Sequence, residues 1–141
     1  MRIKFISLLK GTAYPLNKEL PDTIADNISS IGDVEVVDNA PDLVHVFGKW
    51  SGTTATTMKG YTHKGIPVVF TSANGLVDVL PPHSLMLAPT VFHCCGPAEA
   101  ELIKKLLPKA SVKVIANEQF TLTTDRTTML RQFNDLYASF R

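Results

Sequence analysis

The sequence predicts an α/β fold, a doubly wound Rossmann-like parallel sheet of about six strands with helices on both faces, as a single domain over residues 1–141. Short apolar runs such as Leu43–Phe47 and Val68–Phe70 recur along the chain, with helix-sized segments between them. Unbroken apolar runs are typical of strands that are buried on both faces. Alternation of strands and helices favours right-handed crossovers, and the order 3-2-1-4-5-6 is the simplest prediction.

The composition is that of an ordinary globular domain, with 45% hydrophobic residues, 19% charged residues and a formal net charge of +1. This charge gives no electrostatic reason to expect a nucleic-acid partner. No apolar run approaches the roughly 20 residues that a membrane helix requires. The adjacent cysteines Cys94 and Cys95 fit a reducing cytoplasm, with peripheral association at the inner face of the membrane left open.

The first strand is predicted over Ile3–Leu9, and a helix with a 3.6-residue apolar period follows it. Pro21 suits the first turn of this helix, where a missing N–H costs little, and Gly32 suits the position just past its end. The apolar face of the helix comprises Leu20, Ile24, Ile28 and Ile31.

The second and third strands are predicted over Val34–Val37 and Leu43–Phe47. The segment Thr53–Lys64 has poor helix propensity because Thr53, Thr54, Thr56 and Thr57 are β-branched and Gly60 lies inside it, yet parallel strands require a crossover, so a helix is expected there. Gly65 suits its C-terminal cap, and Val68–Phe70 is the fourth strand.

The segment Leu76–Pro89 contains three prolines and is expected to be irregular. Val91–Cys94 is the fifth strand, and a helix opens at Pro97 and runs to Leu107. Acidic residues in its first turns and lysines near its end agree with the helix dipole. The sixth strand is Val112–Ile115.

The last helix is expected after a connector at Phe120–Thr124, with Thr124 or Asp125 as its cap. It carries the clearest amphipathic stripe in the chain, which predicts core packing. The stripe comprises Met129, Leu130, Phe133, Leu136, Tyr137 and Phe140.

Candidate binding residues lie where strands end, because ligands of open α/β sheets bind at the carboxyl edge. Trp50 suits a sugar-stacking platform and Lys49 a phosphate contact, although Trp50 equally suits packing over the sheet edge. Asn74 and Gly75 suit a ligand hydrogen bond and a close backbone approach, or a plain Asn-Gly turn.

The turn after the first strand is a weaker candidate. Lys10, Gly11 and Thr12 offer backbone N–H groups and one positive charge to a phosphate, but an ordinary strand-end turn is favoured. The Gly-x-Gly-x-x-Gly fingerprint of dinucleotide-binding folds is missing, since Gly11 is its only glycine.

The histidines and cysteines give no complete catalytic or metal site. His45 lies within a strand and is expected to be a buried histidine with satisfied hydrogen bonds. His93, Cys94 and Cys95 are consecutive, so neighbouring side chains point to opposite faces and cannot all bind one ion. Cys95 precedes a helix, which would lower a thiol pKa, but no His or Asp partner can be assigned. The sequence predicts neither a metal nor a cofactor.

Two segments carry a resemblance to a known family. Residues 41–51 read Pro-Asp-Leu-Val-His-Val-Phe-Gly-Lys-Trp-Ser, and residues 63–76 read His-Lys-Gly-Ile-Pro-Val-Val-Phe-Thr-Ser-Ala-Asn-Gly-Leu. Both resemble the N-terminal, acceptor-side domain of GT-B glycosyltransferases of the family 4 type, closest to those of surface-polysaccharide synthesis. Residues 92–101 and 114–118 resemble further segments of that domain, so the similarity extends loosely over nearly the whole chain.

The resemblance implies a domain that binds a sugar or lipid-linked acceptor for transfer from a nucleotide-sugar. It implies a separate donor-binding domain, here on another chain, and it leaves the catalytic residues unknown. A homo-oligomer is also left open. The implied substrate-binding residues are Lys10, Gly11, Thr12, Lys49, Trp50, Asn74 and Gly75.

Two alternatives compete with a transferase. Asn74 stands where the family often has a histidine, and an amide cannot act as a general base. A non-catalytic interaction or regulatory protein that keeps the fold is therefore the main alternative. A flavodoxin-like or other nucleotide-binding domain is the third hypothesis, against which the missing phosphate fingerprint counts.

Overall fold

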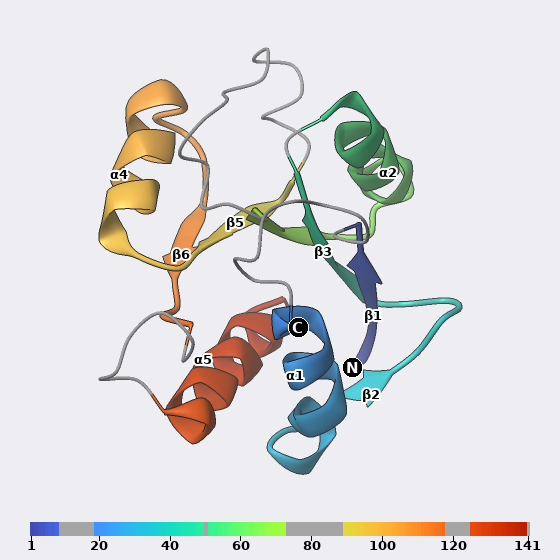
Figure 1. Cartoon of the computed structure of the whole chain (residues 1–141). Coiled ribbons are helices and arrows are strands. Elements are labelled where there is room, and N and C mark those ends of the chain that lie inside the picture. The colour runs from blue at the N-terminus through green and yellow to red at the C-terminus, as the bar shows by residue number, and fades with distance from the viewer. Residues whose placement is uncertain (9–18, 50, 73–88, 118–124, 141) are drawn as a thin grey trace.

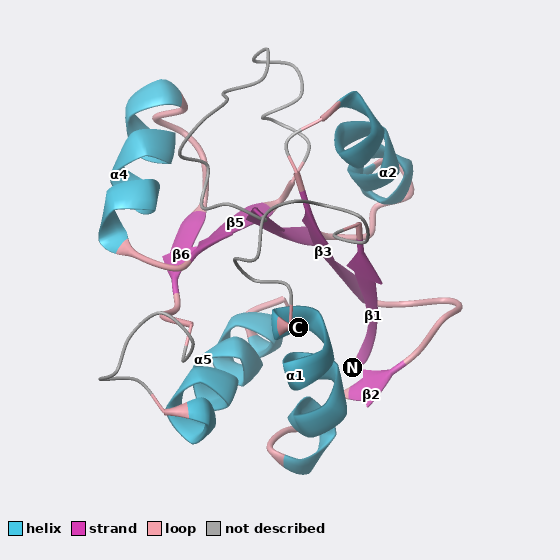
Figure 2. Ribbon diagram, in the orientation of Figure 1, coloured by secondary structure: helices cyan, strands magenta, loops and turns pink. Residues whose placement is uncertain are grey.

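A computed structural model describes residues 1–8, 19–49, 51–72, 89–117 and 125–140, and its described strands form one six-stranded parallel sheet (Figures 1 and 2). This arrangement confirms the predicted α/β class. The elements are β1 Arg2–Ser7, α1 Leu20–Asn27, the 3-10 turn η1 Ile28–Ser30, β2 Glu35–Val36, β3 Leu43–Gly48, α2 Gly52–Thr62, β4 Val68–Ser72, β5 Val91–Cys94, α4 Pro97–Leu106, β6 Val112–Val114 and α5 Arg126–Ala138.

The predicted strand order is wrong in one respect. The sheet runs β2-β1-β3-β4-β5-β6, so that β3 pairs with β1 instead of lying beyond β2. The reason is burial: all six residues of β3 are buried, whereas both residues of β2 are exposed. A short, exposed strand suits a sheet edge, and a fully apolar one needs neighbours on both sides. The order β2-β1-β3-β4-β5 is that of flavodoxin-like folds.

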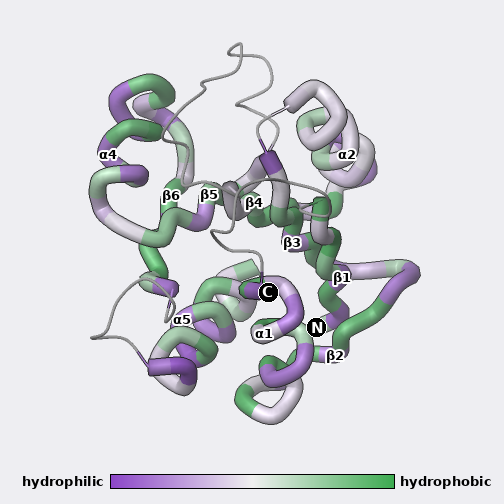
Figure 3. Tube along the Cα trace, viewed as in Figure 1, coloured by the Kyte–Doolittle hydropathy of each residue, from purple (hydrophilic) through white to green (hydrophobic). Residues whose placement is uncertain are grey.

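Two of the described helices cover each face of the sheet. Helices α1 and α5 pack on the face to which Leu43 and Phe47 point, and α2 and α4 pack on the opposite face with Val44 and Val46. The alternation follows from the two-residue period of a strand. Figure 3 shows the resulting hydrophobic centre, with apolar colour concentrated along the strands between the helix layers. The stripe on α5 is core, as predicted.

Helix α2 forms despite its threonines because both of its ends are capped. Ser51 adopts an extended backbone, and its Oγ accepts a hydrogen bond from Thr54 N at 3.2 Å. At the other end Gly65 has a φ of 78°, the left-handed conformation that glycine adopts without strain. Tertiary contacts of Ala55 and Met58, both fully buried, supply the remaining stabilisation.

Gly32 lies just past the end of the helical segment, as the sequence predicts, but it does not adopt the left-handed conformation that is common at that position. Its φ is not positive, and α1 continues into η1, after which Gly32 N donates to Ile28 O at 3.1 Å. A Cβ at Gly32 would instead overlap the side chain of Asn134 on α5. The glycine therefore allows α5 to approach the end of η1. The predicted cap of α5 is confirmed, since Asp125 Oδ1 accepts from Thr128 N at 2.7 Å.

No helix within the described ranges is both long enough and apolar enough to cross a membrane.

Candidate functional site

The strand order creates a break in chain direction between β1 and β3. From β1 the chain crosses to β2 on one side, and it then returns to β3 on the other side. In open α/β sheets the carboxyl edge at such a break is where ligands bind. Here β1 and β3 remain hydrogen-bonded to each other as far as their carboxyl ends, because Leu8 N donates to Phe47 O at 2.7 Å. Gly48 in turn pairs in register with Ser72 of β4.

Gly48 allows three elements to meet at this edge. A Cβ at Gly48 would lie 3.2 Å from Leu8 Cβ and 3.3 Å from Thr54 Oγ1. Those distances are tighter than ordinary van der Waals contacts, and the position is fully enclosed between β1, β3 and α2. A glycine here brings the N-terminus of α2 directly against the ends of β1 and β3.

The turn between β3 and α2 places a lysine close to a helix N-terminus. The first backbone hydrogen bond of α2 joins Ala55 N to Ser51 O at 3.0 Å, so the N–H groups of Gly52 and Thr53 precede the regular ladder. Lys49 is exposed immediately before them. A lysine beside a helix N-terminus favours an anionic ligand group, such as a phosphate.

Lys49 is the one predicted binding residue that falls within the described part of the chain. Lys10, Gly11, Thr12, Trp50, Asn74 and Gly75 lie outside the described residues and stay predictions. They follow β1, β3 and β4, which are neighbours in the sheet. The irregular segment predicted at residues 76–88 and the connector at residues 120–124 lie outside as well.

A titratable carboxyl group stands at the same edge, beyond β5. Glu99 in the first turn of α4 accepts a hydrogen bond at Oε2 from Cys95 N at 3.1 Å. Burial raises the pKa of Glu99 to about 7, although the hydrogen bond from Cys95 opposes that rise. The sequence prediction treated this residue only as a helix-dipole partner. Glu99 is the third residue after the N-cap Gly96, the position from which a capping glutamate reaches back to the helix start, and this signal could have pointed to a contact there.

Cys94 does not share the chemistry of that edge. It is buried against the α2 and α4 face, and burial is the main cause that raises the pKa of its thiol. A thiol with a raised pKa stays protonated and unreactive. His93, its neighbour, packs on the opposite face with its ring 4.7 Å from that of Phe133, so the predicted alternation of faces is confirmed.

The most extensive polar feature is buried inside the α5 face. Tyr137 Oη lies 2.7 Å from His45 Nδ1, and His45 Nε2 lies 2.8 Å from Thr71 Oγ1. Thr71 Oγ1 lies 2.7 Å from His93 Nδ1, and His93 Nε2 lies 2.9 Å from Ile115 O. This chain of four hydrogen bonds, here called the histidine chain, connects α5, β3, β4, β5 and the end of β6.

The carbonyl group at the end of the histidine chain fixes the direction of every bond. Ile115 O can only accept, so His93 donates from Nε2 and its Nδ1 accepts from the Thr71 hydroxyl. Thr71 then accepts from His45 Nε2, and His45 Nδ1 accepts from Tyr137. Burial favours the neutral form of both rings, and in that form this pattern places the proton of each histidine on Nε2.

The electrostatic environment agrees with that assignment. Burial lowers the pKa of His45 well below its ordinary value, with His93 as a second cause, and burial lowers the pKa of His93 to about 4. Burial also raises the pKa of Tyr137, which keeps its proton for donation. The expectation that His45 is a satisfied buried histidine is confirmed, and the histidine chain is structural.

The described residues contain no group of three or more His, Cys, Asp or Glu side chains arranged to hold a metal ion. Both ring nitrogens of His93 are occupied by protein partners, which leaves neither for coordination.

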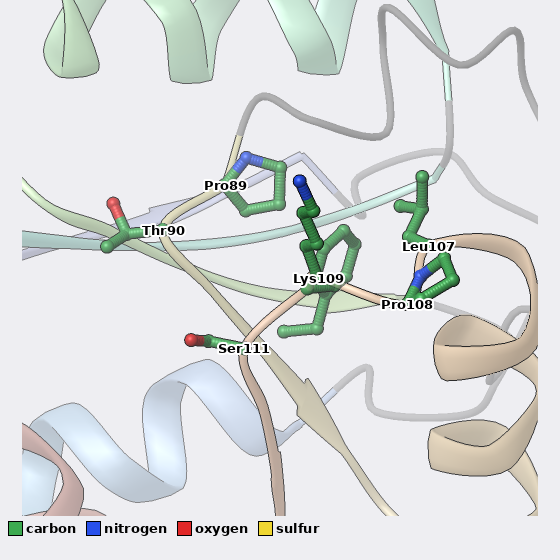
Figure 4. Close-up of a pocket in the computed structure, with 8 residues that line it drawn as sticks. Pro89, Thr90, Leu107, Pro108, Lys109 and Ser111 are labelled. Carbon is green, nitrogen blue, oxygen red and sulfur yellow. The ribbon is translucent and has the colours of Figure 1, made fainter.

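A pocket of about 400 Å³ lies at the opposite, amino edge of the sheet (Figure 4). The pocket is lined by Pro89 and Thr90, which precede β5 in the chain. Leu107, Pro108 and Lys109 line it from the turn between α4 and β6. Sequence reasoning did not predict this pocket, because its lining is apolar and comes from two turns without a motif.

Comparisons with protein families, with curated proteins and with solved structures found no match to this chain.

Proposed function

We propose that this domain binds the acceptor of a glycosyl transfer, a sugar or a lipid-linked sugar, at the carboxyl edge between β1 and β3. The observation that carries the proposal is the position of the Lys49 turn. It follows the strand at the break in chain direction, and it precedes the N-terminus of an eleven-residue helix. The resemblance of residues 41–76 to the acceptor-side domain of GT-B enzymes supports the same edge independently.

The chemistry of that turn suits a phosphorylated acceptor. A lipid-linked sugar carries its sugar on a phosphate or diphosphate, and the Lys49 ammonium group with the N–H groups of Gly52 and Thr53 offers charge and hydrogen bonds to such a group. The nucleotide-sugar would be held by the donor-binding domain of another chain. The transfer would then require both chains.

The first test is a binding measurement by NMR on the uniformly ¹⁵N-labelled protein. The probes are a short-chain polyprenyl-diphosphoryl monosaccharide, UDP-glucose and FMN, each added separately. We expect the lipid-linked sugar to shift the amide signals of Gly48, Lys49, Gly52 and Thr53, and UDP-glucose and FMN to leave them unchanged. No perturbation by the lipid-linked sugar would contradict the proposal.

Substitution of Lys49 provides the quantitative prediction. Lys49→Gln removes the charge and should weaken binding of the diphosphate probe about tenfold, the lower end of the roughly 1.5–3 kcal/mol that a charged hydrogen bond contributes, because Lys49 is exposed to solvent. Lys64→Gln is the matched control, because Lys64 is equally exposed but follows the other end of α2. If the two variants bind the diphosphate probe with equal affinity, Lys49 is not part of the binding site.

A second candidate, a nucleotide-binding domain, is favoured by the flavodoxin-like strand order. Binding of FMN or UDP-glucose with shifts at the same amides would support it and exclude the acceptor proposal. Fold alone does not distinguish these functions.

A further inference from the structure

Strand β6 ends one side of the sheet, and within the described residues no strand pairs with its outer side. Phe92 N donates to Ser111 O and Ile115 N donates to Cys94 O, both at 2.9 Å. In a parallel ladder alternate residues bond to the same neighbour, so the backbone groups of Val112 and Val114 face away from β5. They form a row of donors and acceptors to which another strand can pair.

A hollow of about 500 Å³ lies between this edge and α4. Val112 and Val114 line it from the strand, and α4 contributes the rest of the lining: Pro97, Ala100, Glu101, Lys104 and Lys105. Val114 is 40% exposed, so its apolar side chain is open to solvent beside the hollow. The hollow thus combines apolar residues of β6 and α4 with charged residues of net positive charge, since Lys104 and Lys105 outnumber Glu101.

We propose that the β6 edge binds an extended acidic segment of a partner protein as a seventh strand. Its apolar side chains would lie opposite Val112 and Val114 and fill the hollow. The side chain between them would point to the other face, beside Lys113, where a carboxylate is favoured. Flanking acidic residues would meet Lys104 and Lys105. This interaction goes beyond acceptor binding and does not depend on it.

Charge favours such a partner over a second copy of this chain. If two copies paired antiparallel with Val112 opposite Val114 of the second copy, Lys113 would lie directly opposite Lys113 of the second copy. Like charges that face each other across strands are destabilising. An acidic residue of the partner opposite Lys113 would instead be attracted to the lysine.

The other edge of the sheet serves as an internal control. Val36 of β2 is also 40% exposed. Glu35 N and Val37 N donate to Met1 O and Ile3 O, so the backbone N–H and C=O groups of Val36 point away from β1, as those of Val114 point away from β5. The neighbours of Val36 include Glu35, and Asp33 and Asp38 lie close in sequence. This edge should repel an acidic segment.

The test uses the fluorescein-labelled heptapeptide Ser-Asp-Val-Glu-Val-Asp-Ser and fluorescence anisotropy at low salt. We expect saturable binding that Val114→Pro weakens about tenfold, because proline removes an outward N–H without breaking the ladder to β5. Val36→Pro, which makes the same change at the other edge, should leave binding unchanged. Circular dichroism verifies that both variants are folded.

Charge reversal makes the test specific. Lys113→Glu should abolish binding of the acidic peptide, and a peptide with lysine in place of its central glutamate should restore it. Lys49→Gln should leave the affinity for the acidic peptide unchanged, which separates this interaction from the acceptor site. Three results would each overturn the proposal: no saturable binding at about 1 mM peptide, binding insensitive to Val114→Pro, or self-association in sedimentation that Val114→Pro abolishes.

Discussion

Thr71→Val should lower the free energy of unfolding by about 2–4 kcal/mol, although valine and threonine have nearly the same shape. The substitution leaves His45 Nε2–H without an acceptor and His93 Nδ1 without a donor, and both rings are fully buried. A buried polar group without a partner costs about 1–3 kcal/mol, and two are created at once. Urea denaturation followed by circular dichroism measures the loss, which should move the midpoint by roughly 1–2 M.

Thr71→Ser is the matched control for this prediction. Serine keeps the hydroxyl group that connects the two histidines and loses only a methyl group, which should reduce stability by about 1 kcal/mol. If the valine variant proves as stable as the serine variant, the histidine chain contributes no net stability. The ¹⁵N chemical shifts of the imidazole rings provide a second readout, and they should show both protons on Nε2 in the wild type.

Acidification from pH 7 to pH 5 should destabilise the fold through the two buried histidines. The pKa of His93 is about 4 in the folded protein against roughly 6.5 in the unfolded chain, and the pKa of His45 is lowered as well. On acidification the unfolded chain therefore binds protons at these two histidines that the folded protein does not bind. This stabilising contribution is complete above about pH 6.5 and is lost as the pH falls towards 4. His93 alone accounts for about 2 kcal/mol at pH 5.

Glu99 has the opposite influence, because it stabilises the fold on acidification. The carboxyl group therefore has to be removed before the destabilisation through the histidines can be observed. Its folded pKa of about 7 exceeds the unfolded value, so it gains stability as the pH falls from 7. In Glu99→Gln the slope of unfolding free energy against pH should be steeper by up to about 1.4 kcal/mol per pH unit. Urea titrations of both proteins at pH 5, 6 and 7 provide the slopes. A flat profile in the variant would show that the folded histidines accept protons.

The sequence was sufficient for features that depend on local pattern. The unbroken apolar run of β3 predicts a strand buried on both faces, and the spacing of Phe133 and Tyr137 on α5 predicts one buried face; all of these residues are buried. The Asp125 cap is equally local, since its partner Thr128 lies three residues away. The Thr-rich α2 was predicted against its propensity, because the crossover requirement is stronger than a preference of a few tenths of a kcal/mol per residue.

Features that depend on distant residues were not predictable. His45 reads as a buried histidine, but its partners Thr71 and Tyr137 are 26 and 92 residues away, and nothing near His45 identifies them. The pairing of β3 with β1 has the same origin, because strand neighbours are chosen by the packing of the whole sheet. At the site, the sequence singled out Lys49, whereas the raised pKa of Glu99 depends on tertiary burial.

The histidine chain also has a consequence for the order in which the protein is made. Its hydroxyl donor, Tyr137, lies on α5, the last described helix, whereas the strands that carry His45, Thr71 and His93 are synthesised first. Until α5 has emerged from the ribosome, His45 can satisfy Nδ1 only with water, and among the described helices α1 alone covers that face of the sheet. A nascent chain arrested before Tyr137 should therefore hold a loose, hydrated sheet that a chaperone recognises, and release of α5 should complete folding in one late step.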